Sequence, residues 1–180
     1  MAAAQQSPPH RTREAYLAGL QAGMLGAFWM LAWNGLAAAW QRRGFWAPEN
    51  LLASVFHPHA EIRLDFGPAA ISGLALYLTV YSLLGAGFAA VAGSHPMRHA
   101  RTVLLAVVTA LAWYYFSFYL LWKTISPAIG FLNAGEAAVV GHIIYGLVLG
   151  RFHAHMPLRE QPVAQTVGTE TESRITAPSE

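Results

Sequence analysis

The sequence predicts an all-α integral membrane protein: a four-transmembrane-helix bundle with a short interfacial helix in its first loop and disordered tails. Two observations predict this fold class. Of 180 residues, 55% are hydrophobic and only 11% are charged, whereas an average soluble domain has about 25% charged residues. The apolar residues also gather in four segments, which are separated by charged or Pro- and Gly-containing stretches. A bilayer suits such a chain better than water does.

We expect the four spans at residues 15–40, 69–93, 102–122 and 134–154. The first three are uncharged throughout, and about 20 apolar residues suffice to cross a hydrocarbon layer of about 30 Å. The fourth has only 14 residues between Glu136 and Arg151, so it must extend at both ends. The first span is also far longer than the apolar core of a secretory signal, which has about 7–15 residues. We therefore expect it to be retained.

The segments outside the spans differ in character. Residues 1–14 and 155–180 are polar and have no apolar period, which predicts disordered cytoplasmic tails flanking a membrane domain at 15–154. The outer loop, 41–68, contains the stretch APENLLASVF. There Pro48 suits the first position of a helix and Glu49 its N-terminal turn, and the apolar residues recur at helical spacing. We expect an interfacial helix at 48–56.

The arginine and lysine residues near the spans predict the orientation, because an excess of them marks the cytoplasmic side. Six fall on the side of the termini and four on the other side. This count predicts that both termini are cytoplasmic. The six are Arg11, Arg13, Arg98, Arg101, Arg151 and Arg159, and the four are Arg42, Arg43, Arg63 and Lys123.

His142 is the polar residue in the middle of the fourth span. Ionisable residues inside a membrane are candidates for function. One interpretation is a structural histidine that is hydrogen-bonded to a neighbouring helix, with Tyr77, Tyr81 and Tyr145 at suitable depths. The alternatives are a proton-relay or pH-sensing group and a haem ligand. A haem would need a second ligand from another copy of His142 or from Met24 or Met30.

Small residues form a stripe on two of the spans. Gly19 and Gly23 share a face of the first span, and Gly146 and Gly150 share the face of the fourth span that also carries His142. Small residues at this spacing let helix backbones approach closely within a membrane. We expect these glycines to pack helices, within the bundle or in an oligomer.

Glu136 and Asn34 are the other candidate functional residues within the membrane. Glu136 is expected just inside the outer boundary, on the side of Asn34, where a carboxylate can take up a proton or a cation. The alternative is a structural role. Asn133 stands three residues before Glu136, which is the spacing of a capping box at a helix N-terminus.

The sequence shows no other constellation for catalysis or metal binding. It has no cysteine, no HExxH and no GxSxG motif, which disfavours an enzyme. The inner loop histidines are weak candidates for a metal site beside Met97 and Met156, and ordinary interfacial histidines are the alternative. A net charge of +2 without a basic block disfavours nucleic-acid binding. These histidines are His95, His99, His153 and His155.

The stretch GEAAVVGHIIYGLVLGRF resembles the last span of uncharacterised small bacterial inner-membrane proteins of the YagU type. These proteins also present a Gly-His pair in their final helix. The resemblance covers this span and the four-helix layout, and it implies location in the bacterial inner membrane.

Three functions follow from these observations. The sequence favours a non-enzymatic accessory or assembly protein, which acts through its glycine-lined faces as a homo-oligomer or as a subunit of a larger membrane complex. The first alternative is a small transporter or proton-coupled channel that uses His142 and Glu136. The second is a haem-binding redox protein of the membrane.

Overall fold

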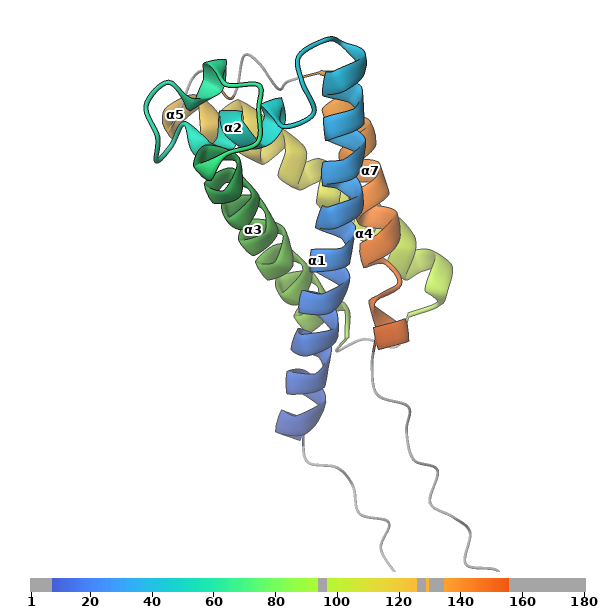
Figure 1. Ribbon diagram of the computed structural model, residues 1–180. Helices are drawn as coiled ribbons and strands as arrows, with labels where there is room; N and C mark the ends of the chain where they lie inside the picture. The colour runs from blue at the N-terminus through green and yellow to red at the C-terminus, as the bar shows by residue number, and fades with distance from the viewer. Residues whose placement is uncertain (1–7, 94–96, 126–128, 130–134, 156–180) are drawn as a thin grey trace, which may run out of the picture.

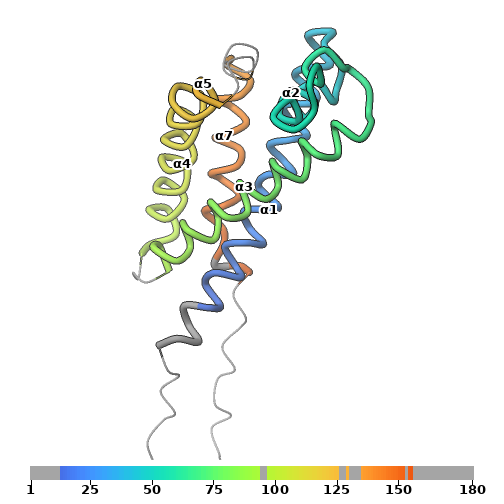
Figure 2. Tube along the Cα trace, turned by 90° about the vertical axis from the view of Figure 1, so that its left-hand side faces the viewer, coloured from blue at the N-terminus to red at the C-terminus, as the bar shows by residue number. Residues whose placement is uncertain are grey.

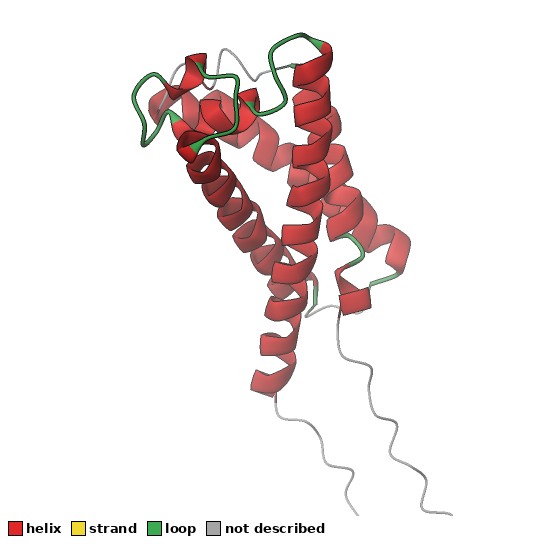
Figure 3. Cartoon of the chain, in the orientation of Figure 1, coloured by secondary structure: helices red, strands yellow, loops and turns green. Residues whose placement is uncertain are grey.

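The computed structural model describes residues 8–93, 97–125, 129 and 135–155. Within these residues it contains helices and loops but no strand (Figure 3). Four helices run alternately up and down (Figure 1): α1 (Pro8–Trp40), α3 (Pro68–Ala92), α4 (His99–Phe116) and α7 (Glu136–Leu149). The two described ends of the chain lie at one end of the molecule, which we call the tail end. The opposite end is the α2 end, because α2 (Ala47–Ala53) lies across it.

Three helical segments are long and apolar enough to cross a membrane: Arg13–Trp40, Pro68–Ala92 and His99–Ile125. Their outward faces carry large exposed apolar side chains, such as Leu36 and Leu104. A monomeric soluble protein rarely exposes apolar surface on this scale. The chain therefore has the surface of a membrane protein. The apolar helix α7 is shorter, with 14 residues, which is about 21 Å of helix.

The first and third helices extend beyond the expected spans. The first helix already begins at Pro8, so residues 8–14, which we assigned to a disordered tail, are helical, while residues 1–7 lie outside the described part. The third span was expected at 102–122. It starts at His99 and continues from α4 through the π-helical segment η2 (Ser117–Leu121) into α5 (Trp122–Ile125).

The fourth helix is shorter than the expected span of 134–154. It ends at Leu149, and the chain turns at Gly150 and Arg151 into the 3₁₀ helix η3 (Phe152–His155). After this turn the side chain of Phe152 is fully buried in the bundle. Its ring centroid lies 5.9 Å from that of Phe88 on α3. Burial of this large apolar ring stabilises the turn.

The short helix of the first loop also differs from the expectation of an interfacial helix at 48–56. It ends at Ala53, and six of its seven residues are buried in the protein. The following segment, which contains the 3₁₀ helix η1 (Ala60–Ile62), folds over it. The side-chain amide of Asn50 fixes this segment by donating hydrogen bonds to the carbonyl oxygens of Arg63 (3.1 Å) and Asp65 (2.9 Å).

The helix α1 is the centre of the bundle, because it packs along both α3 and α7. The helix α4 packs along α7 on the other side. The helices α3 and α4 meet near their connection at the tail end and diverge toward the α2 end (Figure 2). The α2-end half of the bundle is therefore wider than the tail-end half, and the candidate site lies in this wider half.

Candidate functional site

His142 is buried in the bundle with both ring nitrogens engaged. Its side chain is 1% exposed. Its Nδ1 atom lies 2.7 Å from the carbonyl oxygen of Ala138, one turn earlier in α7. Because a carbonyl oxygen can only accept, Nδ1 carries the hydrogen and donates it. The other nitrogen, Nε2, is then an acceptor, and it receives the hydroxyl hydrogen of Tyr81 at 2.8 Å. This pattern describes a neutral imidazole in a fixed orientation.

Three further polar side chains surround this pair. The hydroxyl of Tyr145 donates a hydrogen bond to the backbone carbonyl of Tyr81 at 2.7 Å, which ties α7 to α3 a second time. The amide of Asn34 on α1 lies 3.5 Å from the hydroxyl of Tyr77, to which it donates. The rings of Tyr77 and Tyr81 are neighbours on α3, with centroids 4.6 Å apart. The sequence-predicted residues His142, Tyr145 and Asn34 thus belong to one cluster.

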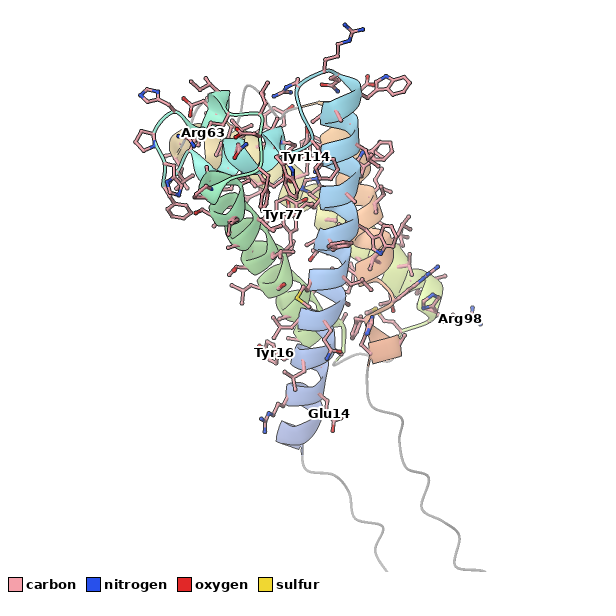
Figure 4. The ribbon with its side chains drawn as sticks, viewed as in Figure 1. Glu14, Tyr16, Arg63, Tyr77, Arg98 and Tyr114 are labelled. Carbon is pink, nitrogen blue, oxygen red and sulfur yellow. The ribbon has the colours of Figure 1, made fainter. Side chains whose placement is uncertain are left out.

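The helix α4 contributes an aromatic wall to the cluster. The ring centroid of Tyr114 lies 5.0 Å from that of His142, and that of Phe118 lies 6.2 Å away. Phe118 belongs to the π-helical segment, and such segments often occur at functional sites. Figure 4 shows Tyr77 and Tyr114 in the α2-end half of the bundle, far from Arg98 at the tail end.

A small cavity lies beside His142, and we call it the inner cavity. Its volume is about 30 Å³, which is enough for a water molecule. It lies where α3 and α4 diverge, and apart from Asn34 and His142 its walls are apolar or aromatic. The aromatic residues on its walls are Tyr77, Tyr81, Trp113, Phe118 and Trp122.

A second and larger cavity opens at the α2 end, and we call it the outer cavity. Its volume is about 630 Å³, which is within the usual range for small-molecule sites. It lies between the end of α1 and the start of α7, which are joined there by a hydrogen bond of 2.9 Å from the indole of Trp33 to the carbonyl of Ala137. Gln41, Arg43 and Glu136 give this cavity a polar lining.

Asn34 and Ala138 line both cavities. The same Ala138 carbonyl accepts the hydrogen bond from His142. Both residues therefore belong to the wall between the two cavities, and the backbone of one of them is bonded directly to the buried imidazole.

The tail-end half of the bundle is closed by glycine packing. Gly19 and Gly23 lie against the backbone of α3 around Gly85. Gly146 and Gly150 lie against α4, where an added Cβ would come within 2.6 Å of the Cα atoms of Val107 and Val103. The predicted glycine faces are thus filled by helices of the same chain.

Glu136 lies apart from the buried cluster. Its side chain is exposed at the mouth of the outer cavity. It is the first residue of α7, and the N-cap is Gly135, which makes no side-chain cap. The capping box with Glu136 at its third helical position is therefore not formed, because the helix starts later than the spacing suggested. Asn133 lies outside the described residues.

The inner histidines do not form a metal site in the part of the chain that the structure describes. His99 and His155 are exposed. No group of three or more histidine or acidic side chains that could hold a metal ion occurs among the described residues. His95 and the side chain of His153 lie outside the described part.

Sequence reasoning missed one buried ionisable residue. Glu49 was interpreted as an N-terminal residue of an interfacial helix, but its side chain is 1% exposed and interacts electrostatically with Tyr77 of α3. One signal was available: Glu49 stands only two residues before the apolar pair Leu51 and Leu52 of a short helix. The aromatic neighbours of His142 on α4 were also missed, because they depend on how α4 and α7 pack.

No family model, curated protein or solved structure matches this chain. The similarity to YagU-type proteins stays a prediction. The geometry of the site is therefore the basis for its function.

Proposed function

We propose that this chain is a small, non-enzymatic membrane transporter or channel that admits a small polar solute from the α2 end to the level of His142. The observation that carries the proposal is the shared wall of the two cavities at Asn34 and Ala138. This wall stands between a polar-lined cavity of about 630 Å³ at the α2 end and the cavity beside the buried imidazole. Gln41, Arg43 and Glu136 in the lining of the outer cavity offer charged and hydrogen-bonding groups to a polar solute.

The tail-end half of the bundle is closely packed, which supports a solute path that opens only at the α2 end. Close packing around Gly23 and Gly146 brings α1 against α3 and α7 against α4 on the tail-end side of His142. Passage through the molecule then requires the helices to separate at the tail end. Such alternation between two openings is the usual behaviour of a transporter.

We also propose that α7 is the fourth span, that the protein resides in a bacterial inner membrane, and that both termini are cytoplasmic. The two described ends of the chain lie on one side of the bundle, as an even number of crossings requires. Arg11, Arg13, Arg98, Arg101 and Arg151 belong to the helix ends and turns of that side, and Arg42, Arg43, Arg63 and Lys123 belong to those of the α2 end. An excess of basic residues marks the cytoplasmic side.

The accessory or assembly function is less well supported by this geometry. The glycine faces that a partner would use are covered by helices of the same chain. A partner would have to bind the lipid-facing surfaces instead. A haem-binding function would require breaking one of the two hydrogen bonds of the His142 ring.

Solute entry into proteoliposomes tests the transporter proposal. We would record stopped-flow light scattering after mixing the vesicles with urea, glycerol or methylammonium chloride, and compare them with protein-free vesicles. Wild-type protein should speed the entry of at least one of these solutes. Ala138→Leu, which fills the shared wall, should remove this increase, whereas Val148→Leu, at a half-buried position of the same helix that lines neither cavity, should keep it.

Equal rates in wild-type and protein-free vesicles for all three solutes would contradict the proposal. If Ala138→Leu does not fold, Asn34→Leu replaces it, because the new side chain has a similar volume but no polar group. Retention of full entry rates in a folded variant of this wall would also contradict the proposed path.

A further inference from the structure

The short helix α2 packs against α3 in direct backbone contact. Gly73 of α3 lies directly under the carbonyl oxygen of Glu49, so that an added Cβ would collide with it. The loop after α2 covers its other side through the two hydrogen bonds of Asn50. The helix is therefore held between α3 and this loop, and the side chain of Glu49 is 1% exposed.

The Glu49 carboxyl group has an oxygen without a partner. Its Oε2 atom is buried and makes no hydrogen bond within the described part of the protein. Burial of an ionised carboxylate without a partner is strongly unfavourable, so such a group takes up a proton instead. Desolvation by burial raises the pKa of Glu49 to about 7, and a hydrogen bond from its own backbone N–H opposes this rise.

No charged group in the described residues stabilises the ionised form of the Glu49 carboxyl group. Tyr77 on α3 interacts with Glu49 electrostatically and is neutral at ordinary pH. None of the other titratable or charged groups on the segments packed around α2 is among the causes that shift the pKa of Glu49. In the described residues these groups are Arg42 and Arg43 after α1, His57, which is bonded to Ser72, His59, Glu61 and Arg63 around η1, and Asp65 after it.

The helix that carries Glu49 also forms part of both cavities. Pro48 lines the outer cavity and Leu52 lines the inner cavity. Glu49 lies between them in the sequence and interacts electrostatically with Tyr77, whose hydroxyl is bonded to Asn34 in the shared wall. Movement of α2 would therefore change the walls of both cavities.

We propose that Glu49 is a proton-binding site of this protein, and that loss of its proton loosens α2 from α3 and so alters access to the two cavities. The proton-binding site stands independently of the proposed transport. The effect on access deepens that function and rests on it. A proton taken up at Glu49 would favour the docked helix, and deprotonation would favour a displaced one.

The direction of the pH dependence follows from the raised pKa. The carboxyl has a pKa of about 7 when α2 is docked and 4.5 as its ordinary value. Between these values the folded state keeps its proton while the unfolded state loses it. The stability of the docked state should therefore fall as the pH rises from the lower value to the upper one, and should stay low above it.

Infrared spectroscopy of the purified protein in detergent tests the site directly. Exposed carboxyl groups are ionised at about pH 6, whereas a protonated Glu49 should still give the carbonyl band of a carboxylic acid. This band should disappear on titration to about pH 8.5 and should be absent from Glu49→Gln at both values. Absence of a titrating band in wild-type protein would overturn the proposal, even if the variant does not fold.

Thermal unfolding over the same range gives a second readout. The melting temperature of wild-type protein should fall as the pH rises, and that of Glu49→Gln, which mimics the neutral acid, should depend less on pH. Glu61→Gln, in the neighbouring η1, should behave like wild type. Identical pH dependence in wild-type protein and Glu49→Gln would overturn the role of Glu49.

Thiol labelling tests the movement of α2. The chain has no cysteine, so Leu52→Cys, which is buried, and Phe56→Cys, which is exposed, can be labelled singly with a maleimide. The ratio of their labelling rates should rise between about pH 6 and about pH 8.5 and should not rise when Glu49→Gln is also present. An equal rise in both backgrounds would overturn the loosening. None of these readouts measures transport, so failure of the proposed function leaves them interpretable.

Discussion

The hydroxyl of Tyr81 on α3 and the imidazole of His142 on α7 form a buried hydrogen bond of 2.8 Å across 61 positions of the chain. Both helices pack against α1, and this bond joins them beside it. The same turn of α3 accepts a second bond from Tyr145 through its backbone. Together these contacts fix the spacing of the helices around the inner cavity.

The Tyr81→Phe substitution should lower the stability of the bundle. It removes the donor and leaves Nε2 of His142 buried without a partner, at an expected cost of about 1 kcal/mol, which is typical of hydrogen bonds inside membranes. Thermal unfolding in mild detergent measures the loss. Tyr115→Phe is the matched control, because Tyr115 is exposed on α4. Equal melting temperatures for the two variants would mean that the bond adds no stability.

Substitution of His142 should separate its structural role from a role in solute entry. His142→Gln retains a donor and an acceptor and should keep much of the stability, whereas His142→Leu should lose about 1 kcal/mol. If entry requires the imidazole to change its charge, both variants should lose it while the Gln variant stays folded. A folded Gln variant with full entry rates at about pH 5.5 and about pH 7.5, on both sides of the usual imidazole pKa, would leave His142 as a packing residue.

The Gly146→Leu substitution should disrupt the contact between α7 and α4. The Cβ position of residue 146 is already within 2.6 Å of the backbone of Val107, so a leucine forces the helices apart. Overpacking of this kind costs roughly 1–3 kcal/mol or more. Val148→Leu, which adds one methylene group at a half-buried position of the same helix, should be mild. Similar melting temperatures would show that the two helices are not in contact.

The sequence predicts the helical framework because apolar length and charge punctuation are local properties. It also predicts a buried His142 near Tyr77, Tyr81 and Tyr145, since these residues lie at similar depth on apolar helices, but it does not select Tyr81 among them as the partner. It does not predict which helices the glycines contact, because small residues give backbones the freedom to approach any neighbour. The environment of Glu49 was unpredictable for a related reason: its burial depends on a loop that folds over α2, and no periodic pattern encodes such a contact.

Reporter fusions should establish the orientation. Fusions after Arg101 and at the C-terminus should report the cytoplasm, and a fusion within residues 57–66 should report the opposite side. The physical reason is the excess of basic residues at the tail end. The fusion within 57–66 also tests whether the solute path opens away from the cytoplasm. A cytoplasmic signal from that position would reverse the direction of the proposed path.

The most direct test of the central claim is the access of water-soluble reagents to the wall between the cavities. Ala138→Cys and Ala106→Cys place single thiols at two buried positions, of which only Ala138 lines the cavities. A small, charged methanethiosulfonate added to oriented vesicles from the α2 end should modify Ala138→Cys much faster than Ala106→Cys, and addition from the tail end should modify neither. Equal protection of both thiols from the α2 end would contradict a solute path that reaches His142.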